Sequence, residues 1–318
     1  MGSIAIPVGI DVSKDTLDVF IARSTGRKRL KVRNDEEGIG TIVRELQGGP
    51  YRLTLEATGR YEALARHRLE EAGFEVIVQH PRLARHLAIG LGVEAKTDPI
   101  DAENLALTAT VCKRTMPRSE FQESLGDISR TISMMTQERS GHKKRLDVPG
   151  FNPTVAQSLR AIIADLDEQI RVLKKLFDAE VRGSALYDRY KLIMSVPSVG
   201  AATSRVFTSE LPEDLSGFTP AQICSHAGLT PLDKSSGASM GHASLKAHGN
   251  MFLKAATYMP AITMLRLDAK AKRIYSSRCA RGLNHQQAIV PVMHMVADRI
   301  AAVAIRGSAW QADPPRRT

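Results

Sequence analysis

The sequence predicts a mixed α/β domain at the N-terminus, then a long helical region, then a mainly helical C-terminal domain. Three observations lead to this fold class. Strand-like and helix-like patterns alternate over the first hundred residues, a polar helical pattern runs from about 118 to 182, and helical patterns dominate after Tyr190. At 318 residues the chain is long enough for more than one core. We expect domains over residues 1–115, 116–186 and 187–318.

The first domain contains five strand-like runs, expected at 4–11, 16–22, 29–33, 52–56 and 74–79. Helices are expected after Asp35 and over 61–72. Three strands, a helix, a strand, a helix and a strand is the order expected of a ribonuclease-H-like (RuvC-like) sheet with helices packed on it. A short basic helix is expected at 82–91. Another begins at Asp98, because Pro99 suits the first helical position.

The central region has apolar residues at three- and four-residue steps, which is typical of a coiled-coil seam. These residues are Leu159, Ile162, Leu166, Ile170, Leu173 and Phe177. Two prolines and a glycine interrupt the helical pattern at 149–153. The sequence therefore predicts a projecting helical hairpin that can pair with another protomer. One long helix packed on its own domain is the alternative.

The C-terminal domain contains Pro197-Ser198-Val199-Gly200, followed by a helical run. This stretch resembles a helix-hairpin-helix element, whose backbone N–H groups hold phosphate without reading sequence. Ser198 replaces the first glycine of the usual pattern, so an ordinary helix turn stays open. Further helices are expected at 220–227, 250–266 and 285–305, with a Gly- and Ser-rich loop over 229–249.

The composition, with 43% apolar and 25% charged residues, is that of a globular chain. Its three cysteines, Cys112, Cys224 and Cys279, are far apart, which argues against a disulfide framework or a zinc site and favours a reducing compartment. No signal peptide and no uninterrupted apolar run of about 18 residues is present. We therefore expect a cytoplasmic protein with no membrane span.

The net charge of +10 is concentrated near the C-terminus. Residues 231–318 contain 13 Lys or Arg and 4 Asp or Glu, a net charge of +9. A localised basic surface is the electrostatic footprint of a nucleic-acid partner. A solvated basic face without a partner is the alternative.

Four carboxylates are candidates for a metal site. Asp11 and Glu56 each end an apolar strand, and Asp98 and Asp101 lie three residues apart at a helix start. Hard cations such as Mg²⁺ bind oxygen ligands from several carboxylates, and a pair of such ions supports phosphoryl transfer. In the alternative, Asp98 and Asp101 favour the helix start and Glu56 pairs with Arg60.

Several motifs occur in the order seen in the insertion-sequence-one-ten family of transposases, which this chain resembles over nearly its whole length. The N-terminal motifs are Gly9-Ile10-Asp11-Val12-Ser13-Lys14, Glu56-Ala57-Thr58-Gly59-Arg60-Tyr61 and Lys96-Thr97-Asp98-Pro99-Ile100-Asp101-Ala102. The C-terminal motifs are Pro197-Ser198-Val199-Gly200, Ala227-Gly228-Leu229-Thr230-Pro231 and Ser236-Gly237. The chain departs from the family at 241–244, where the family usually has more arginines.

The resemblance implies a RuvC-like site made of Asp11, Glu56, Asp98 and Asp101, with Mg²⁺ or Mn²⁺ as cofactor. It also implies a catalytic serine at Ser236, with the adjacent Ser235 as the alternative. Donor and target DNA would be substrates, and a structured noncoding guide (bridge) RNA would pair with both. It further implies a homo-oligomer, either a dimer or a tetramer. This oligomer would work in the bacterial cytoplasm, in association with the nucleoid.

The residues around Ser236 supply no convincing base for its hydroxyl, because only Asp233 and Lys234 are ionisable neighbours. Metals held by the carboxylates are the expected activators, and a flexible loop without chemistry is the alternative.

Three other functions are alternatives to a transposase. A RuvC-type nuclease would use water and leave no covalent intermediate. An actin-like sugar kinase would need a second copy of the loop at Gly9–Ser13, which the sequence lacks. A nonenzymatic nucleic-acid-binding protein would not depend on Asp11.

Overall fold

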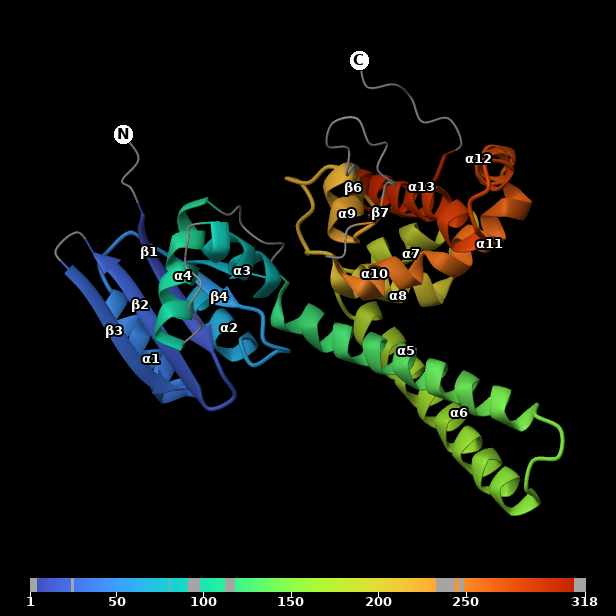
Figure 1. Cartoon of the computed structure of the whole chain (residues 1–318), viewed down its shortest axis with the longest axis horizontal. Coiled ribbons are helices and arrows are strands. Elements are labelled where there is room, and N and C mark those ends of the chain that lie inside the picture. The colour runs from blue at the N-terminus through green and yellow to red at the C-terminus, as the bar shows by residue number, and fades with distance from the viewer. Residues whose placement is uncertain are drawn as a thin grey trace. The chain divides into compact units, whose positions relative to one another are not determined.

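The protein is described by a computed structural model over residues 5–23, 26–79, 81–90, 98–111, 118–232, 244–245 and 249–311. Its chain divides into two compact units, Met1–Met116 and Pro117–Thr318. The first contains a mixed sheet with helices and the second is mostly helical (Figure 1). The predicted fold class is confirmed at this level. The RuvC-like comparison and the three-domain boundaries stay predictions.

The sheet of the first unit has the strand order β3-β2-β1-β4-β5. Its strands are β1 (Ile6–Val12), β2 (Thr16–Arg23), β3 (Gly26–Arg33), β4 (Tyr51–Glu56) and β5 (Glu75–Gln79). The first three strands pair antiparallel, whereas β4 pairs parallel with both β1 and β5. β3 begins three residues before the predicted start, because backbone pairing with β2 extends through its polar first residues.

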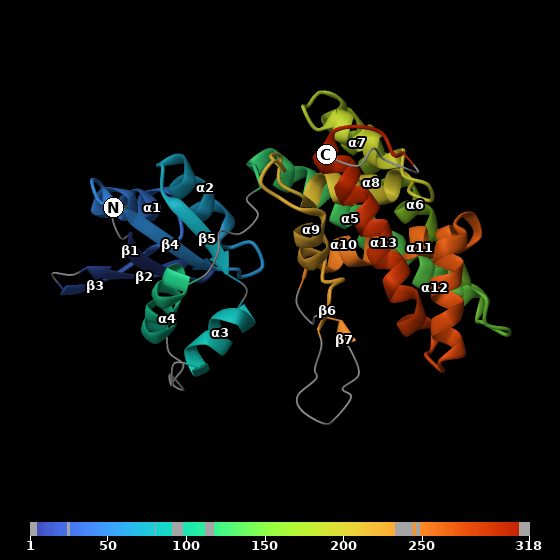
Figure 2. The same cartoon turned by 90° about the horizontal axis from the view of Figure 1, so that it is seen from above.

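Helices cover both faces of this sheet (Figure 2). On one face lie α1 (Glu36–Leu46) and α2 (Ala63–Glu71), over a buried core that includes Ile10, Ile42 and Leu53. Asp35 caps α1 by accepting from the Gly38 N–H at 2.9 Å. On the other face lie α3 (Pro81–Gly90) and α4 (Asp98–Val111). The helix start predicted at Asp98 is confirmed.

The second unit opens with two long helices, α5 (Glu120–Leu146) and α6 (Pro153–Arg182), which pack along each other. They form the predicted hairpin, so the single long helix is excluded. Buried Leu159, Leu166, Ile170 and Phe177 belong to the seam of α6. Ile162 was wrongly placed in that seam and is 43% exposed. The error is one of phase, because one residue turns the side chain about 100° around the helix axis.

The remaining described helices of the second unit are α7 (Tyr187–Met194), α8 (Ala201–Glu210), α9 (Pro220–His226), α10 (Met251–Ala256), α11 (Tyr258–Leu267), α12 (Ala269–Ala280) and α13 (His285–Arg306). Two short strands, β6 (Pro231–Leu232) and β7 (Ser244–Leu245), pair antiparallel. The single helix expected over 250–266 is wrong, because the chain breaks it at Thr257 into α10 and α11. The sequence analysis missed α12.

Within the described residues, α13 is the one helix long and apolar enough to cross a membrane, judged by length and composition alone. It packs against α7, α9, α11 and α12, and Ile289, Val292, Val296 and Ile300 are buried in the unit. Its apolar composition is accounted for by its place in this core.

Candidate functional site

The carboxyl ends of β1 and β4 bring two of the four predicted carboxylates together. Ile10 of β1 pairs with Leu55 of the parallel strand β4, so Asp11 and Glu56 occupy the next register position. Neighbouring strands lie about 4.8 Å apart. Because Ile10 and Leu55 face the core under α1 and α2, alternation places Asp11 and Glu56 on the face that α4 covers. Both residues are partly buried.

Two contacts fix the direction of α4 across this face. The middle of β1 touches the helix at Gly9, where an added Cβ would lie 1.9 Å from the Ala102 carbonyl oxygen. Nearer the start of β4, the Arg52 guanidinium donates to the Ala109 carbonyl at 2.9 Å. The helix therefore runs against the strands, and its first turn points toward the strand ends that carry Asp11 and Glu56.

The other two predicted carboxylates belong to that first turn. Asp101 directly precedes Ala102 and is partly buried. Asp98 begins α4, but its side chain lies outside the described part of the structure. Among the described side chains, no three His, Cys, Asp or Glu residues lie in a group that could hold a metal ion. The role of the four residues as metal ligands stays a prediction.

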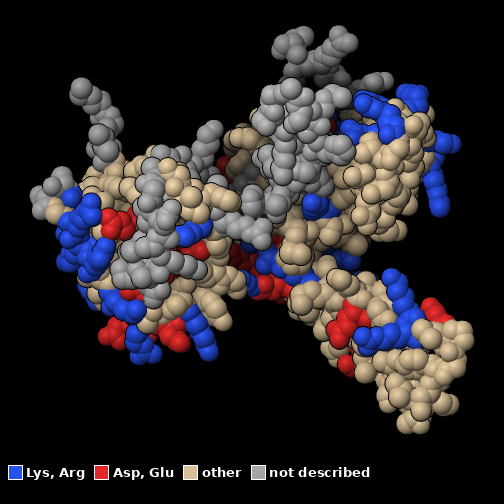
Figure 3. Space-filling view, viewed as in Figure 1, with Lys and Arg blue, Asp and Glu red and all other residues tan. Residues whose placement is uncertain are grey.

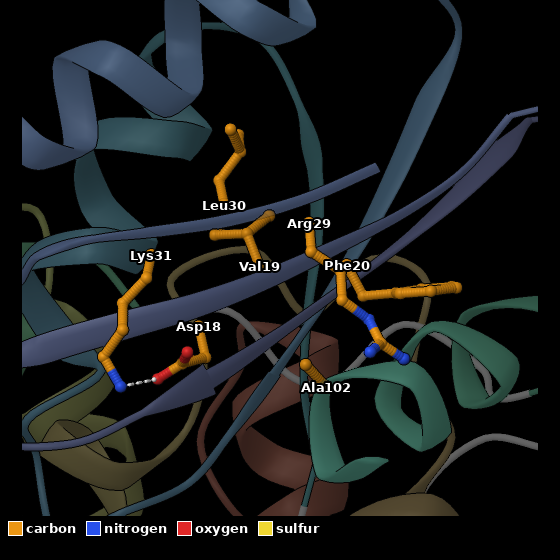
Figure 4. Close-up of a pocket in the computed structure, with 7 residues that line it drawn as sticks. All are labelled: Asp18, Val19, Phe20, Arg29, Leu30, Lys31 and Ala102. Atoms are coloured by element: carbon orange, nitrogen blue, oxygen red, sulfur yellow. Dashed lines mark ion pairs between the residues drawn. The ribbon is translucent and has the colours of Figure 1, made fainter. Parts of the chain in front are cut away.

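A fifth carboxylate on this face was not predicted. Asp18 of β2 lies directly opposite Asp11 in the antiparallel register. Its Oδ2 is 3.0 Å from the Lys31 Nζ, at one side of a pocket between β2, β3 and α4 (Figure 4). Across the pocket, the Arg29 guanidinium lies 5.5 Å from the centre of the Phe20 ring. The sequence signal for Asp18 was its place between two apolar residues of an alternating strand.

Asn34 connects the loops that follow the two carboxylate-bearing strands. Its Nδ2 donates to the Ser13 carbonyl in the β1–β2 turn and to the Tyr61 carbonyl after β4, each at 2.9 Å. The loop after β4 is held by Glu62, whose Oε2 accepts from the N–H groups of Thr58 and Arg60. The hydrogen bond to Arg60 helps to hold this residue at a φ of +92°. These contacts fix the strand ends, and sequence reasoning missed them.

The predicted serine, Ser236, and its alternative, Ser235, lie outside the described residues, but the chain on either side is tightly held. The Asn250 N–H donates to the His226 carbonyl at 2.7 Å. Gly249, at φ +146°, leaves no space for a Cβ, which would lie 2.5 Å from backbone atoms of Gly228. The chain therefore crosses itself at Gly228 and Gly249. Along the sequence, the paired strands β6 and β7 lie between this crossing and residues 233–243.

A buried ion cluster around Glu210 holds Asn250, which lies next to the crossing of Gly228 and Gly249. Glu210 of α8 is 1% exposed. Its Oε2 accepts from Arg118 at 2.8 Å and from the Asn250 Nδ2 at 2.6 Å, and its Oε1 accepts from Arg130 at 2.7 Å. Asn250 also caps α10 through its Oδ1. Burial lowers the pKa of the neighbouring His226, and the positive charge of Arg118 lowers this pKa further.

The stretch that resembles a helix-hairpin-helix forms a turn between α7 and α8. Ser198 has a φ of +77°, the left-handed region that glycine adopts most easily. The serine therefore takes a glycine-type conformation at the position where the usual pattern has glycine. Its capacity to bind phosphate stays a prediction.

Comparison with known proteins places the chain among transposases. A transposase model named for a DEDD domain of IS110 matches residues 8–148, and the model of the IS116/IS110/IS902 transposase family matches residues 190–276. Together they cover more than two thirds of the chain. The two matched regions include Asp11, Glu56, Asp98 and Asp101 in the first and Ser236 in the second.

Curated relatives carry names from the same group. A protein of insertion element IS110 from Streptomyces coelicolor is 29% identical over 163 residues, which is 51% of this chain and 38% of the relative. The pilin gene-inverting protein of Moraxella bovis is 25% identical over 274 residues, covering 80% of this chain and 81% of the relative. An insertion element IS116 protein from Streptomyces clavuligerus is 28% identical over 159 residues, 48% of this chain and 40% of the relative.

Both matched models describe transposases, and this is the class of protein to which the two units correspond. The chain belongs to the IS110 family of transposases, as its motifs indicated. Its alignments span less than half of the two insertion-element relatives and most of the gene-inverting relative.

Proposed function

We propose that the protein is an RNA-guided DNA recombinase that cuts and rejoins strands of an insertion sequence. The observation that carries this proposal is the register of β1 and β4, which brings Asp11 and Glu56 to one face under the first turn of α4. The gene-inverting name of the Moraxella relative, which aligns over most of both chains, favours strand exchange as the outcome.

The carboxylate face fits a divalent cation by the chemistry of its donors. Asp11 and Glu56 present oxygen ligands from neighbouring strands, and Asp101 and Asp98 begin the helix above them. Such ligands suit Mg²⁺ or Mn²⁺ rather than zinc. When bound, the ion would supply charge stabilisation at the transferring phosphate. Calorimetric titration with Mn²⁺ tests this directly, and Asp11→Asn should weaken the binding at least tenfold.

Ser236 is the proposed nucleophile. Its hydroxyl oxygen forms a bond to a DNA phosphorus while the bond from that phosphorus to a deoxyribose oxygen breaks. The serine proton leaves to solvent or a neighbouring base, and the released deoxyribose oxygen takes up a proton. The phosphoserine bond keeps the phosphodiester's energy, so a second strand's hydroxyl can reverse the step without ATP.

A denaturing capture of tagged protein from cells carrying the whole element tests the nucleophile. DNA should remain covalently attached to the wild type and to Ser235→Ala, and should be lost from Ser236→Ala. Loss only in Ser235→Ala would move the nucleophile by one residue. Nicked DNA without any adduct would favour the alternative, a RuvC-type nuclease that uses water.

The guide RNA is the part of the proposal that rests on family resemblance alone. Its test is recombination with and without the noncoding flank of the element supplied in trans. Recombination that proceeds equally well after the flank is deleted, or after the RNA is digested, would remove RNA guidance and leave the recombinase proposal standing.

A homo-oligomer is supported by a second apolar stripe on α6, beside the seam with α5. This outer stripe consists of Val155, Ile162, Val172 and Leu176, each 43–47% exposed. Val155, Ile162 and Leu176 share a seven-residue repeat, which is the spacing of a helix-pairing face. Light scattering of Ile162→Glu with Leu176→Glu should report a smaller particle than the wild type, whereas Arg160→Glu with Lys174→Glu should not change it.

A further inference from the structure

The basic charge of the second unit is concentrated at α12. Between residues 266 and 281 the chain has six Lys or Arg and one acidic residue, Asp268. We name the six the α12 cations: Arg266, Lys270, Lys272, Arg273, Arg278 and Arg281. Figure 3 shows blue side chains gathered on this end of the second unit, with no red beside them.

The single acidic residue of this segment is already engaged. Asp268 caps α12 by accepting from the N–H groups of Lys270 and Ala271 at 2.8 and 3.0 Å. Its other oxygen forms an ion pair with Arg299 of α13. Within the described residues, none of the α12 cations has an ion-pair partner. All but Arg278 are exposed.

The geometry of α12 arranges part of this charge in a row. Ala271 is buried and turns one side of the helix toward the core. Lys270, Arg273 and Ser277 follow at helical steps of three and four on an exposed side, and Arg281 continues the row at the helix end. At a rise of about 1.5 Å per residue, the row is roughly 16 Å long. Lys, Arg and Ser are the side chains that typically contact phosphate oxygens.

The aromatic residues nearby are turned away from this row. The Tyr275 hydroxyl lies 2.9 Å from His285 Nδ1, and the Tyr258 hydroxyl lies 3.1 Å from His285 Nε2. Proteins that hold single strands stack bases on exposed aromatic rings, and this face offers none among its described side chains. The face is therefore suited to a regular, closed backbone such as that of a duplex.

We infer that the α12 cations form a docking surface for the phosphate backbone of double-stranded DNA, which they hold without reading its sequence. A duplex carries one negative charge per about 1.7 Å of axis, so about nine or ten phosphates lie along the length of the row. The inference rests on the proposed function, because it takes the DNA partner from it. It adds the surface that holds the duplex, which belongs to the second unit, whereas the carboxylate face belongs to the first.

The test is binding of full-length protein to a labelled random-sequence DNA duplex, measured by anisotropy between about 50 and 200 mM salt. The variant is Lys270→Gln with Arg273→Gln and Arg281→Gln. The matched control is Arg27→Gln with Lys28→Gln and Arg33→Gln on β3, which removes the same charge from ion-paired cations. A second variant, Lys270→Arg with Arg273→Lys and Arg281→Lys, keeps the charge. Circular dichroism confirms that each variant is folded.

We expect the slope of log affinity against log salt to become shallower by about 2.7 in the α12 variant, because each lost phosphate contact removes about 0.9. The β3 control and the charge-keeping variant should retain the wild-type slope. Equal losses in the α12 variant and the β3 control, or an unchanged slope, would overturn the surface. A loss of affinity in the α12 variant that is larger for duplex RNA than for duplex DNA would also overturn the surface.

The two proposals fail separately. The duplex-binding assay needs no strand cleavage, so its result does not depend on whether the protein recombines DNA. If the protein proves not to recombine DNA yet its binding depends on α12, the proposed function fails and the surface stands. If it recombines DNA but the α12 variant binds with the wild-type slope, only the surface fails.

Discussion

Strand β3 and helix α12 are both dense in Lys and Arg, but their charges meet different surroundings. On β3, Arg27 and Arg29 share Glu103, and the other cations pair with Glu45, Asp18 and Asp35. At α12, the one acidic residue, Asp268, caps the helix and forms an ion pair with Arg299. Counting basic residues would therefore rate the two regions alike, whereas only α12 leaves positive charge to attract a polyanion.

The comparison extends to the units that contain them. The first unit gathers acidic groups at its strand ends, where Asp11 and Glu56 are neighbours. The second holds the buried Glu210 between two arginines and has exposed cations on its surface. The acidic strand ends of the first unit would repel a phosphate unless they held a metal ion. The exposed cations of the second unit would attract a phosphate without any metal ion. This predicts that chemistry and DNA holding can be separated by mutation.

The largest expected effect is on catalysis by the first unit. Asp11→Asn should lower recombination by about 10²–10³-fold or more, because a charged group that stabilises the reacting phosphate is removed. Duplex binding should not decrease, because the change removes a negative charge. Asp18→Asn is the matched control, since it lies opposite on the same face but is paired with Lys31. Equal losses in the two variants would show that the whole face, and not Asp11, matters.

The next effect is on the stability of the second unit. Glu210→Ala should cost about 3 kcal/mol of unfolding free energy, because it leaves the partly buried Arg118 and Arg130 without their shared partner. Glu168→Ala, which breaks an exposed pair with Arg171, should change the stability by less than about 0.5 kcal/mol. Denaturant melts monitored by circular dichroism measure both. A Glu210→Ala variant as stable as Glu168→Ala would contradict the cluster's structural role.

A smaller effect should separate positioning from stability within the first unit. Asn34→Ala removes two hydrogen bonds that tie the loops after β1 and β4, at a cost of about 1–2 kcal/mol. It should also weaken Mn²⁺ binding, because the two carboxylate-bearing strand ends lose their connection. Asn152→Ala removes the cap of α6 at a similar cost in stability. The Asn152 variant should bind Mn²⁺ normally, and equal effects on metal binding would remove the positioning role.

The sequence predicted those features of the fold and the site that depend on residues close together in the chain. The sheet, the cap at Asp35 and the hairpin break followed from local alternation, capping residues and prolines. The sequence also predicted that Asp11 and Glu56 each end a strand, whereas their neighbouring placement came from the strand pairing in the structure. The Glu210 cluster joins residues 40 to 92 positions apart, so no local pattern could indicate it.

Two further differences have local causes. Helix α12 was missed because Lys, Arg and Ser fill its exposed sides and Ala271 alone is fully buried, which leaves almost no apolar periodicity. Ser198 was read as a departure from a glycine pattern. Its backbone nevertheless adopts the left-handed conformation, which a sequence with serine does not suggest.

The smallest expected effect is a pH dependence located beside the Glu210 cluster. Burial lowers the pKa of His226, so the folded protein keeps this side chain neutral at a pH where the unfolded chain binds a proton. The unfolded value is about 6.5. As pH falls through that value, the unfolded state gains protons that the folded state does not take up, so folding stability decreases.

Thermal melts of the wild type between about pH 7 and pH 5 should therefore show a falling midpoint. His226→Gln should flatten this dependence, whereas His285→Gln, a change at an exposed histidine of the same unit, should leave it in place. If His226→Gln melts with the wild-type pH dependence, the buried histidine is not the group responsible.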